Sequence, residues 1–177
     1  MATVVEFRTG VDDKLAYAVR WLRLAAARGA RARVIGPSEL LQALDRALWV
    51  DDPGDFVPHA WARQAGRTPG LERTPLWLGD GALAAPEPGL LLNLGAEIPA
   101  ELGPYERVIE IVATDPADAQ EGRRRWKAYG ERGLAPTPRT KDAAHPSGGA
   151  FQGGFALRQR TAGRHAADQR RGRDPDE

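Results

Sequence analysis

Short apolar runs that alternate with amphipathic helices are the feature of this sequence that most restricts its fold. The run VVEF, residues 4–7, is short and β-prone. After Asp12 and Asp13, which suit the cap of a helix, apolar residues recur at helical spacing until Gly29. These apolar residues are Leu15, Val19, Leu22 and Ala26. The sequence therefore begins with one strand and one helix.

The same unit repeats farther along the chain. ARARVIG, residues 30–36, predicts a second strand, and PSELLQALDRALW predicts a second helix that begins at Pro37 and Ser38. TPLWLGD, GLLLNLG and ERVIEIVAT predict further strands, and a helix, PADAQEGRRRWKAYGERG, follows the last of them. Buried strands separated by helices are typical of the α/β class. We expect a single Rossmann-like three-layer domain with a mostly parallel sheet and helices on both faces.

The composition changes near residue 135. From there the chain is rich in Gly, Pro, Arg and Asp and has few large apolar residues, so it buries too little surface to offset its ordering entropy. We therefore predict an α/β domain over residues 1–134 and a flexible Gly/Pro/Arg-rich tail over residues 135–177. The arginines of the tail could touch nucleic acid weakly, although a solvated appendage is the simpler interpretation.

Charge and cysteine content exclude several classes of protein. Lys and Arg number 25 and Asp and Glu 24, so the net charge of +1 gives no ground for polyanion binding. The absence of cysteine excludes disulfides, thiolate metal sites and a cysteine nucleophile. The N-terminus lacks the apolar run of a signal peptide, and no stretch approaches the roughly 18 apolar residues of a membrane span. We expect a cytoplasmic protein that does not contact membranes.

Catalytic and cofactor-binding motifs are missing. The first strand is followed by RTGVDDK, which has no glycine-rich phosphate loop, and the glycines of LGDG are more typical of a turn. His59, His145 and His165 lack the spacing of a zinc site, and no serine lies in a nucleophile elbow. His59 is most simply a loop residue with local hydrogen bonds. We expect a binding module without cofactor or metal; a small-molecule or nucleotide-binding α/β enzyme is the alternative.

The segment LWVDDPGDFVPH, residues 48–59, concentrates aromatic and proline residues in a loop. Pro53 and Pro58 stiffen it around Trp49 and Phe56. The two aromatic side chains could pack the loop onto the core, which is the usual role of aromatics in a small domain. Alternatively, a rigid cluster of this kind suits a protein interface.

The last predicted helix carries a run of basic residues, Arg123, Arg124, Arg125 and Lys127. Arg123 and Lys127 are four positions apart and share a face. A solvated face is the simpler interpretation, helped by Glu131 one turn beyond Lys127. The alternative is a site for an acidic peptide, because guanidinium groups bind carboxylates in two-point geometry.

Four segments together resemble the chi subunit of bacterial DNA polymerase III. They are ALWVDDPGDFVPHAWA, LLLNLGAEIP, YERVIEIVATDP and RRRWKAYGERGL, in this order and spacing. The resemblance covers roughly residues 4–141. The first strand departs from the family at Phe7-Arg8, where an aromatic pair is usual, and the arginine-rich residues after about Asp142 have no counterpart.

The resemblance implies a non-catalytic accessory subunit. It would join the clamp loader, through a psi-type subunit, to the acidic C-terminal tail of the single-stranded DNA-binding protein, and contact DNA only indirectly. The family's psi-facing surface corresponds to Trp49, Phe56 and Pro58, and the resemblance would also allow a helicase to engage this loop.

The tail-binding site of the family corresponds to Val112, Arg123 and Lys127. Where the family has a further basic residue one turn before Arg123, this chain has Ala119, and Arg124 is the candidate to compensate for it. The affinity for the acidic peptide could therefore differ from that of other members.

Overall fold

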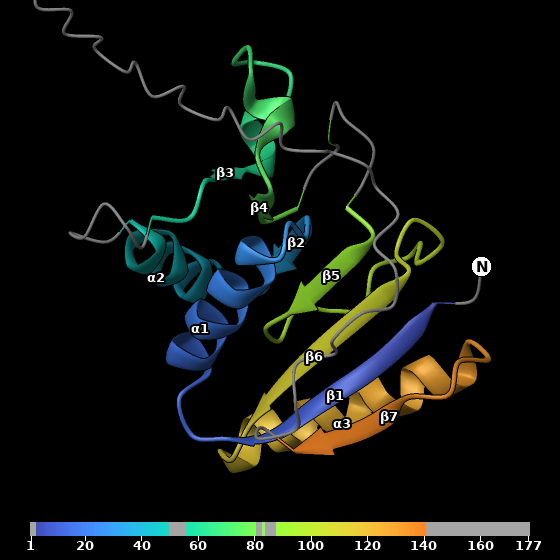
Figure 1. Ribbon diagram of the computed structural model, residues 1–177. Coiled ribbons are helices and arrows are strands. Elements are labelled where there is room, and N and C mark those ends of the chain that lie inside the picture. The colour runs from blue at the N-terminus through green and yellow to red at the C-terminus, as the bar shows by residue number, and fades with distance from the viewer. Residues whose placement is uncertain (1–2, 50–55, 81–82, 84–87, 141–177) are drawn as a thin grey trace, which may run out of the picture. The chain divides into compact units, whose positions relative to one another are not determined.

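The computed structural model describes residues 3–49, 56–80, 83 and 88–140. These residues form a seven-stranded sheet with three α-helices (Figure 1), and two short 3-10 helices separate the third and fourth strands. In chain order the elements are β1 (Val4–Val11), α1 (Lys14–Ala27), β2 (Ala32–Ile35), α2 (Ser38–Leu48), β3 (His59–Trp61), η1 (Ala62–Gln64), η2 (Leu71–Arg73), β4 (Leu76–Leu78), β5 (Leu90–Asn93), β6 (Arg107–Ala113), α3 (Pro116–Glu131) and β7 (Thr137–Thr140).

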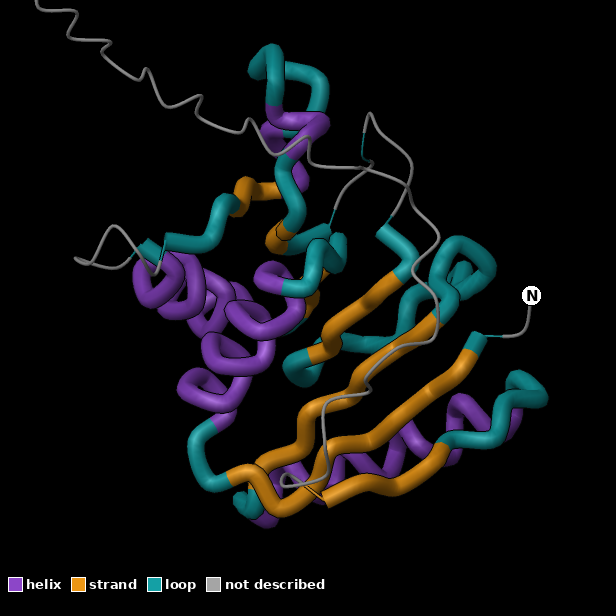
Figure 2. Tube along the Cα trace, in the orientation of Figure 1, coloured by secondary structure: helices purple, strands orange, loops and turns teal. Residues whose placement is uncertain are grey.

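The sheet has the strand order β3-β4-β2-β5-β6-β1-β7, and every pairing among the described strands is parallel. Helices α1 and α2 cover one face, and α3 covers the other (Figure 2). Central strands such as β5 are therefore buried on both faces and are nearly all apolar. The predicted α/β class, parallel sheet and three layers are confirmed.

The ends of the helices follow from local sequence chemistry. The Asp13 side chain caps α1 by accepting a hydrogen bond from the Ala16 amide at 2.9 Å. The helix ends just before Gly29, which has a positive φ of 75°. In α3, Asp115 is the N-cap and Pro116 begins the helix. These ends agree with the sequence prediction.

The core is divided by the sheet into two clusters. The larger one packs α1 and α2 against the sheet and contains Trp21, Leu22 and Leu44. The smaller one lies under α3, where Phe7 contacts Trp126 with ring centroids 4.9 Å apart and Tyr129 at 6.0 Å. In the described part of the chain, no helix is long and apolar enough to cross a membrane.

Strand β3 is an element that the sequence analysis did not predict. It has three residues, His59 to Trp61, and pairs with β4 at one edge of the sheet. Its sequence, HAW, lacks the apolar run that marks the equally short β4. The strand begins directly after the proline-rich loop, so it fixes that end of the loop to the sheet.

Strand β7 corrects the predicted boundary of the tail. Residues 137–140 fall in the region assigned to the tail, yet they pair with β1 at the other edge of the sheet. All four residues are exposed. The composition of this edge strand therefore resembles that of a solvated segment. Pro138 is tolerated because an edge strand needs hydrogen bonds on one side only. The remainder of the predicted tail, residues 141–177, lies outside the described residues.

A buried polar network holds α3 on the sheet. Glu110, in the middle of β6, is fully buried and accepts hydrogen bonds from Asn93 at 2.9 Å, Arg125 at 2.8 Å and Tyr129 at 2.8 Å. Burial raises the pKa of Glu110 above its ordinary value, although Arg125 and the hydrogen bonds oppose this shift. Burial and the adjacent carboxylate also raise the pKa of Tyr129. One side chain of β6 therefore binds two side chains of α3.

We predict that Glu110→Gln destabilises the protein by about 3 kcal/mol or more, because it leaves the Arg125 cation buried without a counter-charge. In the part of the chain that the structure describes, Arg125 Nη2 is already buried without a hydrogen-bond partner, so the cation depends on Glu110. Urea denaturation measures the free energy of unfolding.

The matched control is the double variant Glu110→Gln, Arg125→Met, which removes the cation as well as the carboxylate. It should recover most of the lost stability, because replacing a buried pair costs less than breaking it. Equal losses in the single and double variants would contradict this assignment.

Candidate functional sites

The first candidate site is the exposed aromatic pair formed by Trp49 and Phe56. Trp49 is 61% exposed and Phe56 is 40% exposed, and their ring centroids lie 5.0 Å apart. Residues 50–55 between them, including Pro53, lie outside the described residues. The two rings are therefore exposed and contact each other at the surface.

Neighbouring residues fix the aromatic pair to the fold. Trp49 directly follows α2, where its amide donates to the Asp45 carbonyl at 3.3 Å. Val57, next to Phe56, is 5% exposed and belongs to the larger core cluster. Pro58 is exposed beside it and precedes β3. Trp49, Phe56 and Pro58, predicted as one surface, thus lie where α2 and β3 flank the loop.

The second candidate site is a pocket of about 330 Å³ between α3 and the sheet. Its wall residues come from the ends of β1 and β6 and from one side of α3. They are Phe7, Thr9, Gly10, Val112, Ala113, Thr114, Ala119, Gly122, Arg123 and Trp126. The pocket therefore combines apolar and aromatic walls with one arginine, and we call it the α3 pocket.

The α3 pocket lies at the carboxyl ends of two neighbouring strands whose connections run to opposite faces of the sheet. From β1 the chain continues to α1 on one face and then to β2, whereas from the neighbouring β6 it continues to α3 on the other face and then to β7. The two connections separate at the carboxyl ends of β1 and β6. The pocket therefore opens between the first turns of α3 and these two strand ends.

Gly122 sets how closely α3 approaches β6. A Cβ atom at this position would lie 2.8 Å from Val112 Cγ2 and 2.9 Å from its Cγ1. Such distances are far inside van der Waals contact, so only glycine fits without a shift of the helix or of Val112. Val112 is 5% exposed and forms part of the pocket wall.

The basic residues of α3 have different surroundings. Arg123 is exposed and lines the pocket, and no ion pair to it is present among the described residues. Lys127 lies outside the lining, 81% exposed and 3.7 Å from Glu131. Arg125 is the buried partner of Glu110. The structure thus places Val112 and Arg123 in one pocket, with Lys127 one turn beyond it.

Arg124, the candidate to compensate for the missing basic residue at position 119, does not line the pocket. Its Nη1 lies 2.7 Å from Glu121 Oε1 on the outer surface of the helix, and it is not among the lining residues. Ala119 lines the pocket instead and packs against the smaller core cluster. The pocket therefore has one arginine where the family pattern suggested a larger basic group.

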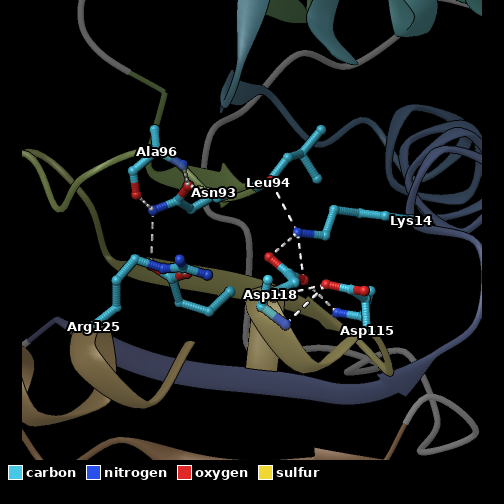
Figure 3. A network of polar contacts seen from close by, with 11 residues as sticks. Lys14, Asn93, Leu94, Ala96, Asp115, Asp118 and Arg125 are labelled. Carbon is cyan, nitrogen blue, oxygen red and sulfur yellow. Dashed lines mark hydrogen bonds and ion pairs between the residues drawn. The ribbon is translucent and has the colours of Figure 1, made fainter. Parts of the chain in front are cut away.

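A polar network fixes the N-terminus of α3 next to the pocket (Figure 3). Lys14, at the start of α1, reaches the Leu94 carbonyl at 3.1 Å and the Asp118 carboxylate at 2.6 Å. Asp118 also accepts from the amide of Ala113 at 2.6 Å, and Asp115 caps the helix by accepting from the amides of Ala117 and Asp118. These contacts join α1, β6, α3 and the residue that follows β5, so the first turn of α3 is held in place.

Sequence reasoning missed Phe7 and Trp126 as wall residues. A signal was present, because Ala119, Gly122, Arg123 and Trp126 have the spacing i, i+3, i+4 and i+7 of one helix face. In the residues the structure describes, no cluster of His, Cys, Asp or Glu could hold a metal ion.

Comparison with known proteins gives a family assignment. Residues 1–137 match the family model described as "DNA polymerase III chi subunit, HolC". The chain is 36% identical over 87 residues to DNA polymerase III subunit chi of Haemophilus influenzae, an alignment that covers 48% of this chain and 56% of the relative. It is 32% identical over 90 residues to the same subunit of Pseudomonas aeruginosa, covering 51% and 59%. The chain thus spans less than three fifths of the length of these relatives.

Among solved structures, the C-terminal domain of S. cerevisiae Dbp5, bound to Gle1 and IP6, aligns with a TM-score of 0.49 and 12% identity. This alignment covers 78% of the chain and 91% of the domain, and it is too weak to bear on function. The family model, in contrast, matches most of the sequence. The chain therefore belongs to the DNA polymerase III chi subunit family.

Proposed function

We propose that the chain is a non-catalytic accessory subunit of DNA polymerase III that bridges two partners during replication in the cytoplasm. One partner is the clamp loader, bound through a psi-type subunit, and the other is the acidic C-terminal tail of the single-stranded DNA-binding protein. DNA is then reached only through that protein. The observation that carries the proposal is the presence of two different surfaces, one near each edge of the sheet.

The two surfaces are separated by the order of the strands. The aromatic pair flanks α2 and β3, and β3 is one edge strand of the sheet. The α3 pocket lies at β1 and β6. Strand β1 neighbours the other edge strand, β7 (Figure 1). Two partners can therefore bind at the same time without sharing contacts, which a bridging subunit requires.

The α3 pocket matches the chemistry of an acidic peptide that ends in an apolar residue. Phe7, Val112 and Trp126 offer an apolar wall for the terminal side chain. Arg123 lines the same pocket and can bind the terminal carboxylate with two parallel hydrogen bonds. Lys127 lies one turn farther along and adds positive charge for the acidic residues that precede it.

The aromatic pair matches the centre of a protein interface. Exposed tryptophan and phenylalanine side chains on a segment anchored by Val57 offer large apolar area at a small cost in side-chain entropy. We assign Trp49, Phe56 and Pro58 to the psi-type subunit. A helicase that used this loop would compete with that subunit for the same side chains.

Trp49→Ala and Phe56→Ala should each weaken binding of the psi-type subunit by about 2 kcal/mol or more, as interface hot spots do. Both side chains are exposed, so thermal unfolding should remain cooperative. Calorimetric titration measures the affinity. The matched control is Val57→Ala, a buried neighbour whose truncation should lower stability rather than affinity. Loss of the unfolding transition in the two aromatic variants would show that they support the fold instead.

Arg123→Glu should strongly reduce binding of the acidic C-terminal peptide of the single-stranded DNA-binding protein, because it places repulsion beside the pocket. The control is Arg124→Glu, which makes the same charge change on the next residue, outside the pocket lining, and should have a smaller effect. Fluorescence anisotropy with a labelled peptide compares the two. Equal effects would mean that the helix acts only through its overall charge.

The salt dependence of peptide binding gives a second prediction for the α3 pocket. Raising the ionic strength from 0.1 M to 1 M shortens the Debye length from about 10 Å to about 3 Å, so contacts of exposed charges weaken. The apolar contacts with Phe7 and Trp126 do not weaken with salt, so peptide affinity should fall without vanishing. Trp49→Ala should leave this binding unchanged. Complete loss of binding at high salt would argue against an apolar anchor in the pocket.

A further inference from the structure

The imidazole ring of His59 connects the two ends of the loop that carries the aromatic pair. Its Nδ1 lies 2.7 Å from the carbonyl oxygen of Val57, and its Nε2 lies 3.2 Å from Asp45 Oδ1 in α2. The His59 side chain is 1% exposed and that of Asp45 is 29% exposed. The ring thus links the last turn of α2 to the segment that leads into β3.

The same ring supports both members of the aromatic pair. Its centroid is 5.3 Å from that of Trp49, in an edge-to-face arrangement, and 6.3 Å from that of Phe56. The Trp49 and Phe56 rings also contact each other. The three rings form one cluster, and His59 is its buried member with hydrogen bonds to the fold.

Both polar neighbours of the ring accept hydrogen bonds. A neutral imidazole has one N–H donor and one lone pair, so in either tautomer a ring lone pair would face an oxygen. Only the protonated ring donates from both nitrogens and satisfies Val57 and Asp45 together. Asp45 is the charged group that faces the ring from α2; three further loop aspartates, Asp51, Asp52 and Asp55, lie outside the described residues.

We propose that His59 is a positioning residue of the partner surface, and that its protonated form holds Trp49 and Phe56 in the arrangement that the partner binds. The inference rests on the proposed function of the aromatic pair. Histidine changes its charge between about pH 5 and 8. Loss of the proton with rising pH removes one of the two hydrogen bonds, so the loop ends separate more easily and binding through the aromatic pair weakens.

The first test measures the affinity of the psi-type subunit for the full chain across this pH range. We expect affinity to fall on the order of tenfold as pH rises, the factor that corresponds to the net contribution of about one hydrogen bond. The decisive variant is Asp45→Asn, whose amide can donate to Nε2 of a neutral ring while Nδ1–H donates to Val57. This variant should bind at high pH as wild type does at low pH, with a much flatter profile.

Other outcomes have distinct meanings. Absence of binding by wild type at every pH would reject the psi-type partner and hence the proposed function. Binding that does not change with pH, or that changes equally in wild type and Asp45→Asn, would reject the role of His59. His59→Phe keeps a ring but removes both hydrogen bonds, so it should bind more weakly than wild type at low pH if it folds.

A second measurement needs no partner. Long-range ¹H–¹⁵N NMR distinguishes protonated from unprotonated ring nitrogens, and the His59→Phe spectrum identifies the His59 signals by their absence. At the low end of the pH range, wild type should show both His59 nitrogens protonated, whereas Asp45→Asn should show the proton on Nδ1 alone. A neutral His59 in wild type at this pH would overturn the inference, whatever the result with the partner.

Discussion

A parallel sheet has to be covered on both faces, and on one face of this sheet the described structure offers a single helix, α3. The helix cannot rely on a broad apolar stripe, because much of its sequence is charged or small. Besides the contacts of Trp126 and Tyr129 with Phe7, it is held by a buried carboxylate on β6, which binds the Arg125 and Tyr129 side chains. Asp118 also joins its first turn to Lys14 and to the Ala113 amide. The position of the α3 pocket depends on these contacts, since the pocket is the space between this helix and the strand ends.

Three consecutive arginines in α3 show how helix geometry divides one residue type among three roles. Successive residues point about 100° apart around a helix axis. Arg123 therefore lines the pocket, Arg124 points to Glu121 on the outer surface, and Arg125 enters the core to meet Glu110. The identity of the residue does not decide its role, but its angle on the helix does.

Much of the fold could be predicted from the sequence, because strand and helix periods, the Asp13 cap and Gly29 all act locally. The short strands β3 and β7 could not, since they lack the apolar runs that mark the equally short β4 and β5, and an edge strand resembles a tail in composition. Of the candidate site residues, Trp49, Phe56, Val112 and Arg123 were predicted from the segments that resemble the family. Phe7 was missed as a wall residue because it comes from a strand that is distant in sequence, and the link between His59 and Asp45 depends on how the loop closes.

Gly122 shows that an absent atom can define a binding surface. Because a Cβ there would overlap both methyl groups of Val112, even alanine would move the helix or the valine. A homologous chain could keep both Arg123 and Lys127 and still present a pocket of different depth if position 122 carried a side chain. Family members that share this pocket shape are therefore better identified by the small residue at position 122 than by the basic residues around it.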